Sequence, residues 1–386
     1  MLETFDIQKS FQFFLKAGLA FIFFLITANK LANFPIDKAV MFLFLGLLMV
    51  HNLLMGKNFS GSSLKALMIM VIFIMISFVI NLPNSTFIVF FPVIGLLFAS
   101  LISKEEEFLT LIYWGLFIHM LFGIYFVISS YIGSINSHVH PMYDKGLPFL
   151  HAAKGFTSTV QSFGTLAIAW FLIYYWKRDL GQLTWIDRVA FVIALTALLL
   201  TFNRNSFLIF YLIMFFKHKK AFFAILVIVF VFYLYFFEFI NSLIFNVSTL
   251  TSRSDLLQAF RIAFFEKAGW MEYFIGHGRN IVPDEIAYRT FYGTGYIENG
   301  TSVLLYTYGF LGYLAYLITV ISLAVLFAIK RHFFMAIMVG YILIIAQQFT
   351  HEFFATTLYI LIAVFLIILN QSTRSEAKNR FLSPTE

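Results

Sequence analysis

This chain has 386 residues, of which 61% are hydrophobic and 12% charged, with a formal net charge of +7 at pH 7. A water-soluble fold of this length could not bury so much apolar surface, so the composition excludes an ordinary soluble protein. Continuous apolar runs dominate where a transmembrane β-barrel would alternate apolar and polar residues. The sequence therefore predicts an all-α polytopic membrane protein.

The absence of cysteine excludes disulfide bonds, thiolate metal sites and a cysteine nucleophile. The basic residues form neither a clustered surface nor a recognisable binding module, so we expect no nucleic-acid partner. The first apolar run starts near Phe11, and no small-residue cleavage site follows it. We therefore interpret it as a retained first span and not as a signal peptide.

About twelve apolar segments have the length expected of membrane-crossing helices. They are residues 10–29, 38–55, 65–82, 85–102, 108–131, 157–176, 186–202, 205–216, 221–238, 300–329, 333–349 and 355–370. One long polar break, residues 239–299, separates the ninth span from the tenth. We expect a single integral membrane domain, residues 1–386, with 239–299 inserted in it as a large periplasmic loop.

Most lysines and arginines of the short loops fall on one side of this alternation, as Arg178 and Lys330 illustrate. Cytoplasmic loops are enriched in Lys and Arg, so that side is expected to be the cytoplasm and to receive both termini. In a bacterium the other side is the periplasmic face of the inner membrane, where ATP and nucleotide-sugars are absent. It receives the 132–156 loop, the Asn203–Asn205 corner, the 239–299 loop and the His351–Glu352 turn.

The 132–156 loop contains three histidines, His138, His140 and His151, and near its end Lys154. The spacing of His138 and His140 suits a metal only weakly, and no carboxylate cluster accompanies it, so no metal site is predicted. His151 and Lys154 precede the next span and are candidate contacts to a phosphate or a sugar. The alternative is that these side chains are simply solvated.

Arg204 lies between two apolar runs that would otherwise merge into one. An arginine at the centre of a membrane helix costs roughly 2.5–3.5 kcal/mol on insertion scales. Its neighbours Asn203, Asn205 and Ser206 are small and polar, as expected where the chain turns around a bound anion. Arg204 is therefore a candidate phosphate ligand, and the alternative is an interfacial anchor that reaches lipid headgroups.

The 239–299 loop contains four arginines. The first two, Arg253 and Arg261, lie on a segment with a helical pattern, residues 253–265. Its apolar stripe consists of Leu256, Leu257, Phe260 and Phe264. Such an amphipathic segment can lie along the membrane surface. The guanidinium fork suits a diphosphate because it offers bidentate hydrogen bonds. We predict Arg253 and Arg261 as diphosphate ligands and expect Arg279 and Arg289 to be solvated.

The sequence of Gly276–Asn280 resembles that of a phosphate-binding turn. It lacks the preceding strand and the third glycine of a dinucleotide fold, so we interpret it as a tight turn at the end of a helix. His277 within it is a candidate substrate contact.

Glu298 and Asn299 stand where the long loop re-enters the membrane. A carboxylate held there, near arginines and partly desolvated, can act as a general base, or it can cap the helix that follows. Asn299 is a candidate substrate contact. His351 is the alternative proton acceptor, although a lone interfacial histidine is often only solvated.

Three segments, in this order, carry a resemblance to a known family. They are Phe202–Leu208 with Arg204 at its centre, the stretch from Arg253 to Gly278, and Glu298–Asn299 followed by Tyr308–Gly312. Together they resemble the O-antigen polymerase and O-antigen ligase superfamily of bacterial surface-polysaccharide assembly. The resemblance covers roughly residues 150–370.

The resemblance implies a metal-independent glycosyltransferase that uses no cofactor and joins lipid-linked glycans at the periplasmic face of the inner membrane. The donor would be a chain on undecaprenyl diphosphate, and the acceptor a lipid-linked repeat unit. Arg204, Arg253 and Arg261 would bind the diphosphate, and Glu298 or His351 would deprotonate the acceptor hydroxyl. The expected partners are membrane lipid, the lipid-linked glycan, a chain-length regulator and a flippase.

Ligases of this superfamily carry a histidine where this chain has Glu298, and that histidine is implicated in activating the lipid A–core acceptor. The replacement favours a polymerase over an O-antigen ligase. A polysaccharide flippase or other transporter is the second alternative. Carriers usually show paired repeats and charges near the midplane, whereas the ionisable residues here collect at the outer boundary. The sugars, their linkage and the oligomeric state stay open.

Overall fold

The computed structural model describes residues 13–14, 16–18, 36–54, 62–82, 87–104, 107–133, 138–142, 147–237, 254, 256–287, 295, 297 and 299–382. Two predicted site residues, Arg253 and Glu298, lie outside these residues, as does most of the first predicted span. The described part of the chain is helical apart from short turns and one two-stranded sheet.

Most of the helices follow the apolar segments of the sequence, and α12 and α13 lie within the predicted 239–299 loop. They are α2 (Ile36–Leu54), α3 (Ser62–Ile80), α4 (Phe87–Ile102), α5 (Glu107–Tyr131), α6 (Val160–Asp179), α7 (Trp185–Leu199), α8 (Arg204–Lys217), α9 (Lys219–Tyr235), α12 (Trp270–Ile275), α13 (Asp284–Ala287), α14 (Gly300–Ile329), α15 (Phe333–Gly340) and α16 (Thr356–Leu382). The segment predicted as one span over 333–349 is divided into α15, a π-helical turn η4 (Tyr341–Ile345) and a 3-10 turn η5 (Ala346–Gln348).

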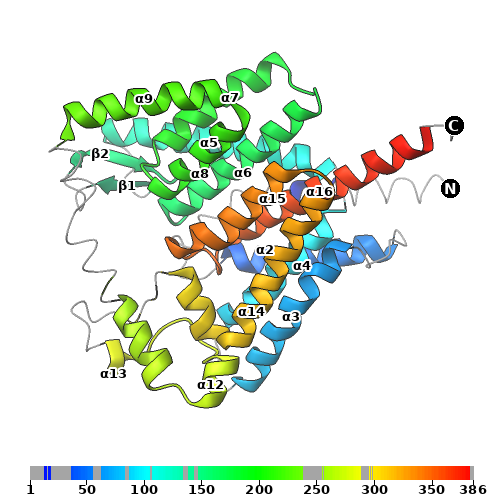
Figure 1. Ribbon diagram of the computed structural model, residues 1–386, viewed down its shortest axis with the longest axis vertical. Helices are drawn as coiled ribbons and strands as arrows, with labels where there is room; N and C mark the ends of the chain where they lie inside the picture. The colour runs from blue at the N-terminus through cyan, green and yellow to red at the C-terminus, as the bar shows by residue number, and fades with distance from the viewer. Residues whose placement is uncertain are drawn as a thin grey trace.

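Two groups of helices meet at α16. Helices α5 to α9 pack together, and α2, α3, α4 and α14 form a second group, with α16 packed against both α6 and α4 (Figure 1). Every residue of α16 from Thr356 to Leu369 is buried. Burial on every face places this part of α16 between the two groups, so residues 356–369 lie at the centre of the helices that the structure describes.

Two helices, α5 and α14, have the length and apolar composition needed to cross a membrane. Shorter apolar helical stretches cover Leu67–Ile80, Phe87–Ile102, Phe333–Gln348 and Thr356–Ser372. Helix α9 packs against α8 and has no buried residue, although it is apolar on every face. Large exposed apolar surface of this kind suits contact with lipid or another apolar partner.

The 132–156 region, which the sequence predicts as a loop, contains a β-hairpin. Strand β1 (Val139–Met142) pairs antiparallel with β2 (Leu147–Ala153), with Val139 opposite Ala153. Both strands pack on α5, and the N–H of Ala153 donates to the carbonyl of Leu200 at 2.7 Å. Strands this short leave little periodicity in a sequence. Here their packing on α5 fixes the position of Lys154, the residue that follows β2.

Helix α14 is kinked at Gly309, which has φ 70° and ψ −174°. The turn after α12 docks into this kink, with Gly276 at φ 89°, and a β-carbon on Gly276 would lie 2.3 Å from the Thr307 carbonyl oxygen. The N–H groups of His277 and Gly278 donate to carbonyls of α14 that the kink exposes. The predicted tight turn at the end of a helix is confirmed.

Candidate functional site

Three adjoining cavities lie at one end of the helices. The largest, about 710 Å³, includes Arg204 and Lys154 in its lining and is called the Arg204 cavity below. The Asn299 cavity, about 250 Å³, shares Phe349 with it. The Asp37 cavity, about 170 Å³, shares Ser158, Thr159 and Gln161 with it. These shared side chains show that the three cavities adjoin one another.

Helix N-termini converge on these cavities. The first turns of α2, α6, α8, α14 and α16 all contribute lining residues, among them Lys38, Gln161, Arg204, Ser302 and Thr357. The N–H groups of a first helical turn have no partner within the helix, and the helix dipole places partial positive charge there. An end that collects several such termini favours an anionic ligand.

Arg204 is the first residue of α8. Asn203 caps the helix, because its side chain accepts a hydrogen bond from the N–H of Asn205 at 3.1 Å. Phe202 before it has a φ of 49°, a left-handed conformation that is rare for a bulky side chain. This strained turn follows the end of α7 and sets the direction of α8. As a result the Arg204 side chain is exposed at the cavity.

Lys154 reaches the same cavity from the end of the hairpin and is only 5% exposed. Its carbonyl accepts hydrogen bonds from the hydroxyl and the N–H of Thr157, at 2.6 and 2.9 Å. Burying an ammonium group is costly unless charge or polar groups compensate it. Two cations from distant segments thus line one cavity, which is the arrangement that an anion requires. His140 also lines this cavity, whereas His138 stacks on Phe126.

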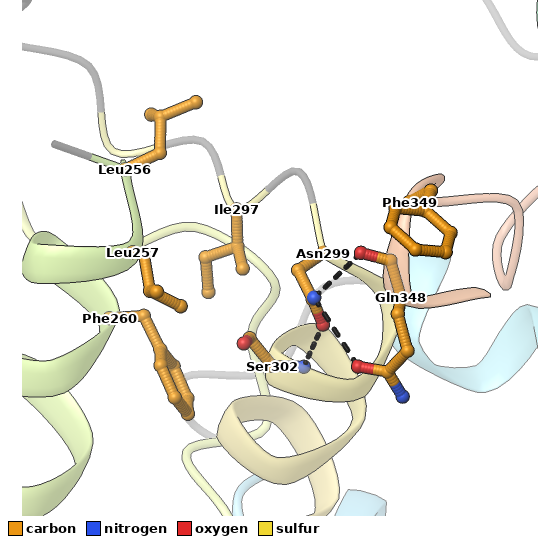
Figure 2. A pocket seen from close by; sticks show the side chains of 8 residues that line it. All are labelled: Leu256, Leu257, Phe260, Ile297, Asn299, Ser302, Gln348 and Phe349. Atoms are coloured by element: carbon orange, nitrogen blue, oxygen red, sulfur yellow. Dashed lines mark hydrogen bonds between the residues drawn. The ribbon is translucent and has the colours of Figure 1, made fainter. Parts of the chain in front are cut away.

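Asn299 is the N-cap of α14 and links this helix to η5 by hydrogen bonds. Figure 2 shows its amide between Ser302 and Gln348: Oδ1 accepts from the Ser302 N–H at 3.0 Å, and Nδ2 donates to the Gln348 carbonyl at 2.8 Å. Across the cavity stand Leu257 and Phe260, from the helical residues 256–261 (Figure 2). The Asn299 cavity therefore has an apolar wall facing a polar one.

Three predicted substrate or phosphate contacts line none of these cavities. His151 forms a 2.6 Å hydrogen bond with Ser130 through Nδ1 and joins the hairpin to α5. His277 stacks on Tyr306 with ring centroids 4.1 Å apart, beside the kink of α14. Arg261 is exposed just before the π-helical turn η3 (Ile262–Glu266). Their roles in binding stay predictions.

His351 lines the Asp37 cavity, in the non-helical segment that precedes α16. Burial lowers the pKa of His351 to about 4, so the ring is neutral near pH 7. Burial raises the pKa of the adjacent Glu352 to about 7, although a 2.6 Å hydrogen bond from the Thr165 hydroxyl opposes this rise. The Glu352 carboxyl lines none of the three cavities.

Sequence analysis singled out neither Asp37 nor Lys38, which lie in the first turn of α2 and line the Asp37 cavity. Both are buried, at 4% and 8% exposure. A charged pair at the start of an apolar run was the available signal, since such charges are rare at membrane depth. No group of three or more His, Asp or Glu side chains in the described residues is placed to hold a metal ion.

A second polar cluster lies at the other end of α6. Lys177 pairs with Asp187 at 2.8 Å, Arg178 with His218 at 2.7 Å, and Lys217 with Asp179. Helix α6 has 20 residues, so about 30 Å separates this cluster from the Arg204 cavity. That length matches the hydrocarbon core of a bilayer.

Comparison of the chain with protein-family models and with curated proteins finds no match. The geometry of the cavities and the resemblance of the three sequence segments are therefore the two supports for a function.

Proposed function

We propose that this protein is a polysaccharide polymerase of the bacterial inner membrane. It joins oligosaccharide repeat units carried on undecaprenyl diphosphate, at the periplasmic face. The observation that carries the proposal is the presence of Arg204 and Lys154 in one cavity, at converging helix N-termini. A cationic cavity of this kind suits a diphosphate.

The neighbouring cavities fit the other two parts of such a substrate. The Asn299 cavity offers Leu256, Leu257 and Phe260, which suit the first isoprenoid units of a carrier lipid. The Asp37 cavity is lined mostly by hydroxyl, amide and charged groups, which suit a sugar. Lipid, diphosphate and sugar would then lie in order across three adjoining cavities.

The membrane placement follows from the two polar ends of α6. The Lys177 and Arg178 end has the basic residues expected at the cytoplasmic face. The Arg204 cavity then opens at the periplasmic face, and the chain crosses the membrane many times with both termini in the cytoplasm. The exposed apolar surface of α9 supports lipid contact.

In the proposed reaction the bond between the anomeric carbon of the donor and its phosphate oxygen breaks. Arg204, Lys154 and the helix N-termini stabilise the charge that develops on the departing diphosphate. Arg253 and Arg261 are further diphosphate ligands on the strength of the sequence. Glu298 and His351 are the candidate bases that the sequence offers. No metal or nucleotide is needed, because the diphosphate ester already activates the donor sugar.

An O-antigen ligase uses the same donor and transfers the finished chain to lipid A–core. A flippase moves the lipid-linked unit without cutting it. A chain-length regulator and a flippase are the protein partners that a polymerase requires. All three functions would use the cationic cavity, so the products formed in the cell must distinguish them.

The test is a gel profile of surface polysaccharide from a clean deletion strain, complemented with variants. Core capped by a single repeat, with the ladder lost, is expected on deletion and with Arg204→Ala at normal protein level. Arg188→Ala is the matched control because this exposed arginine lies in the first turn of α7, at the opposite end. Bare core with long polymer still on carrier lipid would make the protein a ligase. A full ladder in Arg204→Ala would overturn the proposed site.

A further inference from the structure

The Asp37 cavity has an unusually polar lining for a space among apolar helices. Nine of its eleven lining side chains are polar: Asp37, Lys38, Ser158, Thr159, Gln161, Ser162, His351, Thr356 and Thr357. Its volume of about 170 Å³ is comparable with that of one sugar ring. Hydroxyl, amide and charged groups in this density match a ligand that both donates and accepts hydrogen bonds.

Asp37 is the buried acid of this cavity. Its Oδ2 accepts a 2.6 Å hydrogen bond from the Thr356 hydroxyl, and the Lys38 ammonium lies 4.0 Å from the same oxygen. Its Oδ1 is buried and receives no hydrogen bond from any described residue, and the same holds for the hydroxyl of Thr357. A buried carboxylate oxygen without a donor is costly, and Asp37 is among the residues that line the cavity, so a ligand hydroxyl that donates to this carboxylate would compensate the cost.

We infer that the Asp37 cavity is the acceptor-sugar subsite and that Asp37 removes the proton from the attacking hydroxyl. This inference rests on the proposed function. Lys38, Gln161 and Thr357 hold the other hydroxyls of the same sugar. The cavity adjoins the Arg204 cavity through Ser158, Thr159 and Gln161, so the attacking oxygen faces the donor's anomeric carbon.

The step balances without a further reactant. The acceptor oxygen forms a bond to the anomeric carbon as the bond from that carbon to the phosphate oxygen breaks. The electron pair of the broken bond goes to the diphosphate, which Arg204 and Lys154 hold. The acceptor proton passes to Oδ1 of Asp37 and leaves to water once the lengthened glycan has moved away.

A purely structural clamp between α2 and α16 is the competing explanation for the Asp37–Thr356 hydrogen bond. Asp37→Asn separates the two roles, because an asparagine oxygen still accepts from Thr356 but cannot take up a proton. Asp37→Ala leaves space beside the cavity in which a small carboxylate can bind. Glu352→Gln is the matched control, since this buried carboxyl is nearby and lines none of the cavities.

The experiment measures elongation of lipid-linked repeat units by the purified full-length protein in bilayer discs. Asp37→Asn is expected to lower turnover by roughly 100-fold or more, while its melting temperature and its binding of undecaprenyl diphosphate match the wild type. Formate is expected to restore part of the turnover of Asp37→Ala, and chloride at equal ionic strength is not. Glu352→Gln is expected to elongate normally at pH 7.

Elongation at the wild-type rate by Asp37→Asn, or no effect of formate on Asp37→Ala, would overturn the inference. If Arg204→Ala is inactive in that same case, the proposed function survives and only the role of Asp37 is lost. If the wild-type protein elongates no repeat unit, the proposed function itself fails, and the acceptor subsite fails with it.

Discussion

Gly164 on α6 and Ser206 on α8 approach so closely that a β-carbon on Gly164 would lie 2.0 Å from the Ser206 hydroxyl oxygen. The contact is between the first turn of α8 and the start of the second turn of α6. It holds the N-terminus of α8, and with it Arg204, against the segment Ser158–Gln161 that lines the same cavity. The position of the cationic cavity therefore depends on a glycine that makes no contact with the proposed substrate.

Gly164→Ala is expected to displace the start of α8. Overpacking of this kind costs about 1–3 kcal/mol, and it should lower polymer formation because Arg204 moves relative to Lys154. Thermal unfolding in detergent and the polysaccharide ladder measure the two effects. Adding Ser206→Gly removes the clashing hydroxyl and should restore both. A double variant as impaired as the single one would show that this contact does not position α8.

Lys154→Met removes the buried charge and retains most of the side-chain volume. If Lys154 stabilises the departing diphosphate, turnover should fall about 100-fold or more, with little loss of protein in the membrane. Lys219→Met is the control, because Lys219 is exposed at the far end of α8 and α9. Turnover is measured as repeat units added per minute by membranes of the two strains. Equal ladders from both would remove Lys154 from the site.

Gly309→Ala should destabilise the protein severely. A β-carbon there would lie 2.4 Å from the backbone of Phe274, and the residue has a φ of 70° that L-residues rarely adopt. Strained backbone alone costs about 1–3 kcal/mol, and the overlap adds to it. Gly340→Ala provides the comparison, since nothing lies within 4 Å of a β-carbon at this helical position. That variant should be neutral or stabilising by about 0.5–1 kcal/mol, as read from melting temperatures.

Glu352 should make stability fall as the pH rises. Its pKa is raised from an ordinary 4.5 to about 7, so between these values the unfolded chain has lost the proton that the folded chain keeps. The contribution of Glu352 to the free energy of unfolding is fully present below about pH 4.5 and is lost by about pH 7. It amounts to a change on the order of 3 kcal/mol in total. Glu352→Gln should therefore melt higher than the wild type at pH 8 and equally at pH 4.5. Identical melting at pH 8 would contradict the raised pKa.

His351 should act in the opposite direction. Its pKa is lowered from 6.5 to about 4, so between these values only the unfolded chain binds the proton, and stability falls as the pH falls. The two neighbouring groups then offset each other over much of the range from pH 4.5 to 6.5. In His351→Gln only the Glu352 effect remains, so stability should fall as the pH rises through this range. In Glu352→Gln only the His351 effect remains, so stability should rise as the pH rises. Melting curves at three pH values in this range measure both slopes.

Two variants separate the helix-capping role of Asn299 from its predicted role as a substrate contact. Asn299→Asp keeps the oxygen that caps Ser302 and loses the donor to the Gln348 carbonyl. Asn299→Ala loses both, and loss of the cap costs about 0.5–2 kcal/mol. If the residue serves only structure, polymer formation should follow stability, with Asp above Ala. Loss of polymer in Asn299→Asp at unchanged stability would instead support the predicted substrate contact.

The apolar runs of the sequence determined where the helices lie. From α2 onward each predicted segment coincides with a helix within a few residues, apart from the division of 333–349 and the extension of α16 beyond residue 370 to Leu382. This was possible because a helix in apolar surroundings needs only a continuous run of apolar side chains. The sequence also predicted Arg204 as a phosphate ligand and Lys154 as a contact to a phosphate or a sugar, since charges beside such runs are costly and few.

Only the tertiary structure decided which distant polar groups meet. Asp37 and Thr356 are 319 residues apart and share a hydrogen bond, and Thr165 meets Glu352 across 187 residues. The kink at Gly309 likewise depends on the turn at Gly276, which lies in another part of the chain. Apolar patterns specify that a segment is helical and buried. They contain no information on which helix packs beside which, because close packing between side chains of separate helices settles that choice.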